Sequence, residues 1–346
     1  MSMAEMTTSS PEASAITTVV RTGDESAFSA LVERYRGELR VHCYRMLGSF
    51  EDSEDMVQET FLRAWRKRAS FEGRSSFSAW LYRIATNTCL DFLTRNERRV
   101  VLAETAVDSG AGSLPPDIPW LQPYPDRLLD QMSARDSEPD ALVVRKETIE
   151  LAFLVAIQLL PPKQRAVLIL RDVLDWSAKE TADLLDVSVA SVNSALQRAR
   201  ATLQAHQPQH SREWAPGLDP SVEERALLQR YVEASERGDP DAIAALLRED
   251  VRFSMPPEPG SWVGRDAVVG GWVDGGFGTA SFGDFRCVVT RANRMPAVAC
   301  YHRKPGAAEY RAFALDVLRI ENGQIAEVTA FSLGPVLDAL GLPPTL

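Results

Sequence analysis

The sequence predicts a multidomain protein in which two all-α domains, the second a helix-turn-helix domain, precede an α+β domain. In the first hundred residues, apolar side chains recur with the helical period along 52–65 and 77–92. Two further helical patterns, at 177–185 and 189–203, flank a short turn, which is the layout of a helix-turn-helix. Beyond residue 240 the apolar residues alternate or form short runs between turns, which is typical of strands.

Two polar segments divide the chain into these domains. The segment 104–131 contains five prolines and no sustained period, so we expect a long, largely extended connector there. The segment 206–221 is a second polar break. The expected order is a helical domain at 15–100, a linker at 101–140, a helix-turn-helix domain at 141–205, a linker at 206–220 and an α+β domain at 221–346.

Charge and composition narrow the class of function. The chain has a formal net charge of −10, yet residues 61–100 contain nine basic and three acidic side chains, so a polyanion would be attracted to that region. No apolar run reaches about 18 residues, which predicts a cytoplasmic protein without membrane contact. The four cysteines are scattered and no histidine has metal-ligand spacing, so we expect reduced thiols, no metal and no cofactor.

Each helical domain has an apolar and a polar face. In the first domain, acidic and basic side chains oppose the apolar stripe of 52–65, and the loop 68–77 combines aromatic residues with arginines. In the second, Ser177 and Glu180 form a capping box at a helix start. The last helix there has an inner face made of Val192, Ala195, Leu196, Ala199 and Leu203. On its own, this pattern also fits an ordinary helical hairpin.

The C-terminal domain begins with helices and continues with strands. Asp239 is placed to cap a helix that starts at Pro240. The pair Asn322-Gly323 marks a hairpin turn between two strand segments. We therefore expect helices followed by a curved antiparallel sheet.

Three long segments resemble the signature domains of extracytoplasmic-function sigma factors of bacterial RNA polymerase. They are "EDSEDMVQETFLRAW", "FEGRSSFSAWLYRIATNTCLDFL" and "LPPKQRAVLILRDVLDWSAKETADLLDVSVASVNSALQRARATL". The resemblance covers about 20–100 and 145–205 and implies a non-enzymatic protein. It implies that the first domain binds core polymerase and opens the −10 promoter element, while the second contacts the −35 element.

The resemblance also implies particular contact residues. The polymerase contacts, at the β′ clamp, would be Asp55, Gln58, Glu59, Leu62 and Arg63, and the β flap would be a second polymerase contact. The contacts to the −10 element would be Phe71, Arg74, Phe77, Asn87, Asp91 and Arg95, since opening a duplex requires stacking and neutralisation of single strands. We expect Trp80 to belong to the core.

The contacts to the −35 element would lie on the outer face of the last helix of the second domain. They are Ser191, Asn193, Ser194, Gln197, Arg198 and Arg200. Many family members have lysine and arginine where this chain has Asn193 and Ala195. Promoter DNA is thus an expected partner, together with core polymerase and an anti-sigma factor.

The tail resembles a polyketide-cyclase-like domain of the nuclear-transport-factor-2 superfamily, which is a cone of sheet and helices around a pocket. The resemblance rests on "LLQRYVEASERGDPDAIAALLREDVRFSMPP" and "ALDVLRIENGQIAEVTAF". The segment "WLQPYPD" looks like a linker motif of sigma factors with such tails, which makes Trp120, Leu121, Pro123 and Pro125 candidate regulatory residues. An Asp-Gly-Gly-Gly-Lys motif found in some groups is replaced here by "SMPPEPG".

Three roles remain open for the tail: a regulatory module that docks on the linker or the sigma domains, a small-ligand sensor, and an enzyme. Trp262, Trp272 and His302 are the candidate pocket residues. Acid-base catalysis would have to use residues from a short set, namely Asp266, Asp274, Asp284 and His302. For the whole chain, the alternative is a ligand-responsive helix-turn-helix repressor, which would bind its duplex operator without polymerase.

Overall fold

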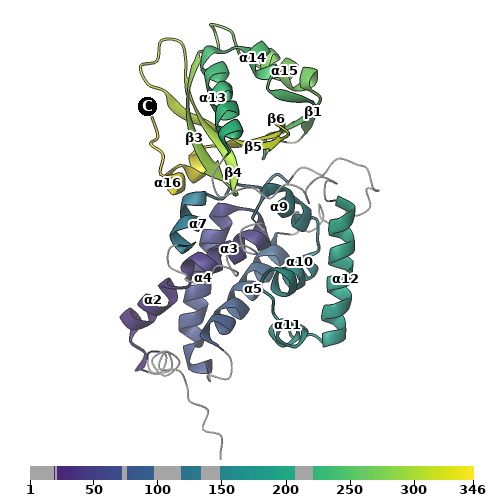
Figure 1. Cartoon of the computed structure of the whole chain (residues 1–346). Coiled ribbons are helices and arrows are strands. Elements are labelled where there is room, and N and C mark those ends of the chain that lie inside the picture. The colour runs from purple at the N-terminus through teal and green to yellow at the C-terminus, as the bar shows by residue number, and fades with distance from the viewer. Residues whose placement is uncertain are drawn as a thin grey trace, which may run out of the picture. The chain divides into compact units, whose positions relative to one another are not determined.

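The computed structural model describes residues 19, 22–71, 76–96, 118–133, 149–206, 221–258 and 260–346 (Figure 1). They fall into two compact units. The described parts of the first unit lie within Met1–Leu47, Asp52–Ala103 and Pro161–Arg200, and those of the second lie within Gly48–Glu51, Glu104–Leu160 and Ala201–Leu346. None of the helices in these ranges combines the length and the apolar character that a membrane span requires.

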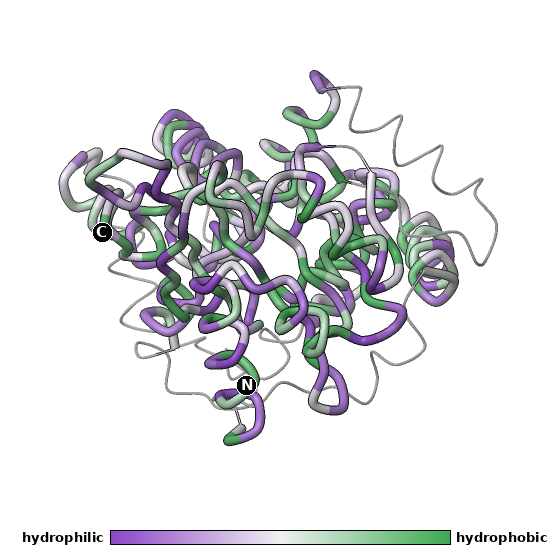
Figure 2. The backbone as a smooth tube through the Cα atoms, turned by 90° about the horizontal axis from the view of Figure 1, so that it is seen from above, coloured by the Kyte–Doolittle hydropathy of each residue, from purple (hydrophilic) through white to green (hydrophobic). Residues whose placement is uncertain are grey.

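The N-terminal helices enclose an apolar core. They are α2 (Glu25–Glu33), α3 (Arg36–Leu47), α4 (Phe50–Lys67) and α5 (Phe77–Arg95), with a short 3-10 helix η1 at Arg68–Ser70. Asp24 accepts hydrogen bonds from backbone amides at the start of α2, and Ser76 does the same for α5. Helices α3 and α5 pack on each other. In the tube drawing of the whole chain, hydrophilic and hydrophobic residues are interspersed along the coiled segments (Figure 2).

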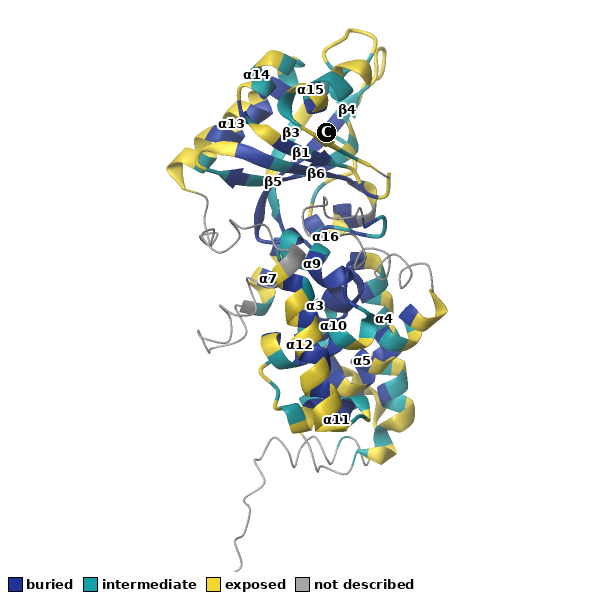
Figure 3. Ribbon diagram, turned by 90° about the vertical axis from the view of Figure 1, so that its right-hand side faces the viewer, coloured by how far each residue is buried: buried dark blue, intermediate teal, exposed yellow. Residues whose placement is uncertain are grey.

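The helix-turn-helix is formed as the sequence predicts. Its two helices are α11 (Ala178–Leu185) and α12 (Val189–His206). They follow α10 (Pro162–Leu168) and the π-helical segment η2 (Ile169–Val173) in the first unit, while α9 (Leu151–Gln158) belongs to the second unit. Ser177 and Glu180 make both hydrogen bonds of the capping box, and Asp186 ends α11 in the left-handed conformation with φ 54°. All five residues of the predicted inner face of α12 are buried. The opposite face of α12 is exposed (Figure 3).

The C-terminal domain is a six-stranded sheet with helices against it (Figure 1). The strands are β1 (Leu247–Ser254), β2 (Ser261–Val263), β3 (Asp284–Ala292), β4 (Met295–Arg303), β5 (Arg311–Glu321) and β6 (Gln324–Ser332), in the order β2-β1-β6-β5-β4-β3. The helices are α13 (Val222–Arg237), α14 (Pro240–Ala244), α15 (Arg265–Asp274), η3 (Gly334–Val336) and α16 (Leu337–Leu340). Asp239 caps α14, and Asn322 and Gly323 form the predicted hairpin turn with positive φ.

Two expectations about local structure were wrong. The sheet is mixed, because β1 runs parallel to β6, whereas we expected an antiparallel sheet. An apolar pattern specifies that a strand exists, but the direction of a neighbour distant in sequence is set by tertiary packing. The connector that we expected to be extended instead ends in a helix, α7 (Asp126–Ser133). In this helix Leu129 is buried and Leu128 is half-buried.

Candidate functional site

One face of α4 carries the side chains that the sequence assigned to polymerase contact. Asp55 and Gln58 are exposed, and Leu62 is 52% exposed. An exposed apolar side chain therefore lies among polar and charged ones, with Asp55, Gln58 and Glu59 on one side of it and Arg66 on the other. Such a combination suits the interface core and polar rim of a protein partner.

Arg63 joins this surface to the next helix. Its guanidinium forms ion pairs with Glu59 at 2.7 Å and with Asp91 of α5 at 2.6 Å. The hydrogen bond that Arg63 donates to Glu59, followed by the one that it donates to Asp91, raises the pKa of Arg63 above its ordinary value. Sequence reasoning placed Arg63 and Asp91 in different sites, whereas the structure brings them together as one bridge between α4 and α5.

A polar stripe runs along the outer side of α5. Arg83, Asn87, Asp91 and Arg95 are all exposed and occur at every fourth position, so they lie on one helix face. The Arg83 guanidinium donates to the backbone carbonyl of Asp183 on α11, within the first unit. Of the four residues on α5 that were predicted for DNA contact, Asn87, Asp91 and Arg95 are thus aligned on one face.

The aromatic residues of this region are distributed differently from our expectation. Phe77 is only 3% exposed and its ring lies 6.4 Å from Phe28, 5.6 Å from Tyr35 and 5.5 Å from Trp80. Phe71 and Trp80 are half-buried at the edge of this cluster. Phe77 is therefore a core residue, since its period-matched position at the start of α5 turns it inward. Arg74 lies outside the described residues.

The outer face of α12 presents all six predicted contact residues, each of them exposed: Ser191, Asn193, Ser194, Gln197, Arg198 and Arg200. Ser188 precedes α12 and caps it, because its hydroxyl accepts a hydrogen bond from the Ser191 amide at 3.1 Å. Arg200 is held by Asp172 of η2 through two hydrogen bonds of 2.7 and 2.8 Å, and this hydrogen bonding raises the pKa of the guanidinium. Arg198 is the other charged residue of this set, and no ion pair of its side chain is found among the described residues.

The linker segment that contains the predicted regulatory residues is packed into the second unit. Leu121, Pro123 and Pro125 are buried, and Trp120 is half-buried. The Gln122 side chain accepts hydrogen bonds from the Ser49 hydroxyl at 3.0 Å and from the Glu51 amide at 2.9 Å. The linker is therefore an ordered structural element over 118–133.

The β3–β4 hairpin turn is buried under this linker. Asn293, with 0% exposure, accepts from the Tyr124 amide at 2.8 Å through its side chain, while its own amide donates to the Tyr124 carbonyl at 2.8 Å. Its side-chain amide also donates to the Ile149 carbonyl at 2.6 Å. Sequence analysis missed Asn293, because an asparagine in a turn ordinarily indicates only a solvent-exposed hairpin tip.

Charged side chains complete the contact between linker and tail. Asp126, 3% exposed, accepts from the Arg294 amide at 2.8 Å and lies 3.3 Å from the Arg291 guanidinium. Arg294 itself forms a 2.6 Å ion pair with Asp130. Desolvation raises the pKa of Asp126, against the opposing effect of Arg294. At the other side of α7, Arg127 donates to the carbonyls of Asp338 and Ala339.

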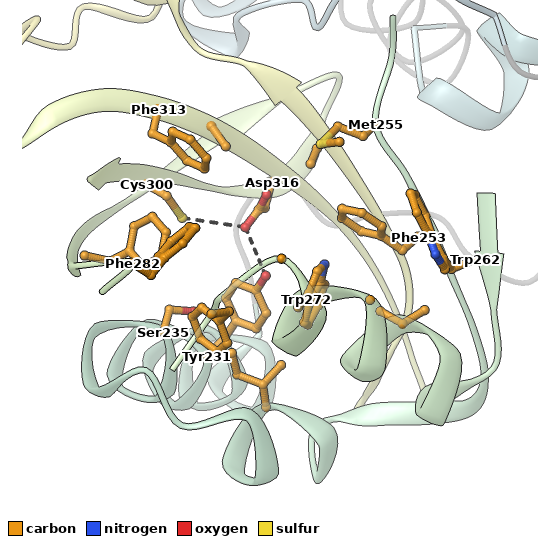
Figure 4. A pocket seen from close by; sticks show the side chains of 18 residues that line it. Tyr231, Ser235, Phe253, Met255, Trp262, Trp272, Phe282, Cys300, Phe313 and Asp316 are labelled. Carbon is orange, nitrogen blue, oxygen red and sulfur yellow. Dashed lines mark hydrogen bonds between the residues drawn. The ribbon is translucent and has the colours of Figure 1, made fainter. Parts of the chain in front are cut away.

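The tail contains an apolar cavity of about 440 Å³, enclosed by the sheet, α13 and α15 (Figure 4). Two of the three candidate pocket residues, Trp262 and Trp272, are among its lining residues. His302 is not among the lining residues. Its Nε2 lies 2.8 Å from the Phe282 carbonyl, and the centroid of its ring lies 4.7 Å from that of the Phe282 ring, which is tilted by 44°.

One polar group stands out in the cavity wall. Asp316 accepts a hydrogen bond from the Tyr231 hydroxyl at 3.0 Å, and the Cys300 thiol lies 3.6 Å away (Figure 4). Desolvation raises the pKa of Asp316 to about 6. The predicted catalytic candidates Asp266, Asp274 and Asp284 do not line the cavity, and Asp284 pairs with Arg303 at 2.6 Å. In the described ranges no group of three or more His, Cys, Asp or Glu side chains could hold a metal ion.

Family models match all three bodies of the chain. The Sigma-70 region 2 model matches residues 31–99, the Sigma-70 region 4 model matches 150–203, and the SnoaL-like domain model matches 228–328. This combination defines a sigma factor with a SnoaL-like tail.

The relatives agree with this class over nearly the whole chain. ECF RNA polymerase sigma factor SigG of Mycobacterium tuberculosis is 40% identical over 330 residues, which cover 94% of this chain and 86% of SigG. SigW of Bacillus subtilis is 32% identical over 53% of this chain and 90% of its own. The crystal structure of the Mycobacterium tuberculosis extracytoplasmic function sigma factor SigJ has the same fold, with a TM-score of 0.54, 21% identity and coverage of 91% of this chain and 99% of SigJ.

The chain belongs to the family of ECF RNA polymerase sigma factors. This confirms the resemblance seen in the sequence and replaces the alternative of a ligand-responsive repressor. As a sigma factor, the protein has core RNA polymerase and promoter DNA as its partners.

Proposed function

We propose that the outer face of α4 is the surface that binds core polymerase at the β′ clamp. Exposed Leu62, together with Asp55 and half-buried Glu59 on the same helix face, supports this role, because an apolar centre with a charged rim favours a specific protein contact. Arg63 would hold Glu59 in place and connect the surface to α5. The helix-turn-helix domain would contact the β flap.

Replacing Asp55 and Glu59 together with alanine should weaken binding to core polymerase by about tenfold, equivalent to about 1.4 kcal/mol. Fluorescence anisotropy with the labelled full chain measures this affinity. Glu249→Ala with Glu309→Ala removes two exposed acids from the tail and serves as the control for net charge. Equal affinity of the two double variants would exclude the α4 surface.

We propose that the stripe of α5 contacts the −10 element. Asn87 and Arg95 are exposed on the same helix face as Arg83, and the half-buried rings of Phe71 and Trp80 lie at the start of this helix. Exposed aromatic edges beside cations favour contact with single-stranded bases. Arg74, assigned to this site from the sequence, belongs to the same proposal.

We propose that α12 binds the −35 element in the major groove. Asn193, Gln197 and Arg198 have the side-chain types that pair with adenine and guanine edges. Arg200, already held by Asp172, is positioned for a phosphate rather than a base.

Arg198→Ala should weaken use of the −35 element by about 1–3 kcal/mol if the side chain makes a base contact. Transcription in vitro with saturating core polymerase, on promoters that carry or lack a matched −35 element, measures the effect. Lys179→Ala on α11 is the control for loss of one exposed cation. A loss that is the same on both promoters would instead indicate a phosphate contact.

We propose that the tail regulates the sigma domains through the linker. The observation that carries this proposal is the burial of the β3–β4 turn against 118–133, where Asn293 makes two hydrogen bonds to Tyr124, with a third to Ile149. Deleting residues from 207 onward should change the transcription rate without changing the choice of promoter. Identical activity of the full and shortened chains under all conditions would exclude regulation by the tail.

A second role for the tail, as a sensor of a small apolar ligand, is favoured by the cavity. Its walls are mainly aromatic and aliphatic, and Asp316, hydrogen-bonded to Tyr231, supplies a polar group beside Ser235 in the lining. A flat, uncharged aromatic molecule with one hydrogen-bonding group fits this chemistry. Catalysis by the tail has less support. The titratable side chains among the lining residues are one carboxyl group, Asp316, the Tyr231 hydroxyl and the Cys300 thiol.

A pyrene derivative with one hydroxyl group should quench the fluorescence of the tail in a saturable way, because Trp262 and Trp272 line the cavity. Ala314→Trp places a bulky ring at the cavity wall and should abolish this binding. Ala307→Trp, at an exposed position outside the lining, is the matched control. Equal quenching in both variants would show that the probe binds elsewhere.

The remaining expectations follow from the family. We propose that the protein acts in the cytoplasm, where its polymerase partner transcribes DNA, and that an anti-sigma factor binds the same sigma-domain surfaces. An anti-sigma factor bound to the outer face of α4 would compete directly with the β′ clamp of core polymerase.

A further inference from the structure

The β3–β4 hairpin of the tail holds two thiols next to each other. Cys287 of β3 and Cys300 of β4 are directly opposed in the strand register, and their sulfur atoms lie 3.5 Å apart. From the sequence we expected separate reduced thiols, because Cys287 and Cys300 do not form a motif such as Cys-x-x-Cys. The pairing of the strands is what brings them together.

The backbone at this pair has the geometry that a disulfide between antiparallel strands requires. The Cys287 amide donates outward to Glu236 of α13 at 3.0 Å, so it does not bond to β4. Cys287 and Cys300 thus form a non-hydrogen-bonded pair, in which the Cα atoms of opposed residues are about 4.5 Å apart and the side chains are closest. The two-residue turn at Asn293 and Arg294 gives the same result. Hydrogen-bonded and non-hydrogen-bonded pairs alternate along the hairpin, starting from the hydrogen-bonded pair Ala292 and Met295, so the pair Cys287 and Cys300 is of the non-hydrogen-bonded type. A Cα separation of about 4.5 Å lies within the range of natural disulfides.

The two thiols differ in access and surroundings. Cys287 is half-buried, whereas Cys300 is 6% exposed and lines the cavity beside Asp316. The hydrogen bond from Cys287 and burial raise the pKa of Cys300 well above its ordinary value, so Cys300 is a protonated thiol. The other two cysteines of the chain, Cys43 and Cys89, are fully buried in the helical core.

We propose that Cys287 and Cys300 are a redox-active pair that hydrogen peroxide converts into a disulfide between β3 and β4. Cys287, the more accessible sulfur, attacks a peroxide oxygen, the O–O bond breaks, and a sulfenic acid and water form. Cys300 then attacks the Cys287 sulfur, the S–O bond breaks, and the hydroxyl leaves as water with the proton of the Cys300 thiol. Two thiols are oxidised and one peroxide is reduced to two waters. The Asp316 carboxylate, 3.6 Å from the Cys300 sulfur, is placed to accept that proton and pass it on.

Oxidation changes the polar end of the cavity. A disulfide sulfur has no proton, so Cys300 can no longer donate to Asp316, which keeps the hydrogen bond from Tyr231. The volume beside Cys300 also changes as the sulfur moves toward β3. This effect on ligand binding rests on the proposed sensor role, whereas formation of the disulfide does not.

Peptide mapping of the full-length protein tests the pair directly. Trypsin separates all four cysteines, with Cys287 in 287–291 and Cys300 in 295–303. After peroxide treatment, denaturation and alkylation, the two peptides should appear as one linked species. Its mass should equal the sum of the two thiol peptides minus two hydrogen atoms, and a thiol reductant should separate the peptides. Cys43 and Cys89 should remain available to alkylation only after denaturation. Linkage of Cys287 to any other cysteine, or sulfinic acid at Cys287 with Cys300 still alkylated, would overturn the proposal.

Single variants distinguish the order of the two steps. In Cys300→Ser, Cys287 should stop at the sulfenic acid, which a dimedone probe labels. In Cys287→Ser, Cys300 should resist the same peroxide dose. Labelling of Cys300 in Cys287→Ser, at the rate seen for Cys287 in Cys300→Ser, would contradict the assigned roles. Binding of the hydroxypyrene probe before and after oxidation reports separately on the cavity, so failure of the sensor role leaves the disulfide result intact.

Discussion

Phe77→Ala should lower the free energy of unfolding of the N-terminal helical domain by about 3–5 kcal/mol, which is the usual range for truncating a buried phenylalanine. Phe77 is 3% exposed and contacts the rings of Phe28, Tyr35, Phe71 and Trp80. The truncation would leave a void at the centre of this cluster. Chemical denaturation followed by far-ultraviolet circular dichroism measures the loss.

Asn87→Ala is the matched variant on the exposed face of the same helix. Its stability should stay within about 0.5 kcal/mol of the parent protein, because the position is on the surface. Promoter opening, measured by permanganate reactivity of unpaired thymines, should fall in this variant if Asn87 contacts the −10 element. If Phe77→Ala instead kept its stability and lost only promoter opening, the Phe77 ring would contact DNA. Its buried position would then not hold when the protein is bound to polymerase and promoter.

Asn293→Ala should detach the linker from the tail. The change leaves the buried Tyr124 amide and Ile149 carbonyl without their partner, at about 1–3 kcal/mol for each group. Alanine also tolerates the φ of 56° at this position less well than asparagine, which adds about 1 kcal/mol. Hydrogen exchange of the Tyr124 amide should therefore become faster by several orders of magnitude. If the tail regulates transcription through the linker, the activity of Asn293→Ala should approach that of the chain shortened at 207.

Asn322→Ala separates the two contributions. Asn322 has a φ of 51° in the β5–β6 turn, is exposed, and has the same backbone strain as Asn293 without linker contacts. This variant should lose about 1 kcal/mol and leave exchange at Tyr124 unchanged. Comparable loss of protection in both variants would mean that the turn conformation, and not the Asn293 hydrogen bonds, holds the linker.

The predictions that succeeded depend on short-range physical chemistry. Ser177 and Glu180 lie three residues apart, so the capping box follows from local geometry alone. The buried face of α12 follows from the helical period, and the turn at Asn322 and Gly323 follows from the backbone conformations that these residues accept. The same period correctly left the six proposed DNA-contact residues of α12 exposed.

The expectations that failed depended on where distant parts of the chain meet. Phe77 and Trp80 are three residues apart on one helix, and only the packing of Phe28 and Tyr35 decides which ring is enclosed. His302 lies on a strand of the cavity sheet, but its ring hydrogen-bonds to Phe282 and does not line the cavity. Asp316 and Tyr231, which supply the polar end of the cavity, come from a strand and a helix whose contact no local pattern indicates.

The sequence by itself determined that the chain has two helical sigma regions and an α+β tail, because periodicity, caps and turns act over a few residues. It also determined which face of α12 is exposed to solvent. Only the tertiary structure decided that β1 runs parallel to β6, that Asn293 is buried against the linker, and that Cys287 opposes Cys300. These contacts join residues far apart in the chain, and their partners are selected by packing and by satisfaction of buried polar groups across the whole domain.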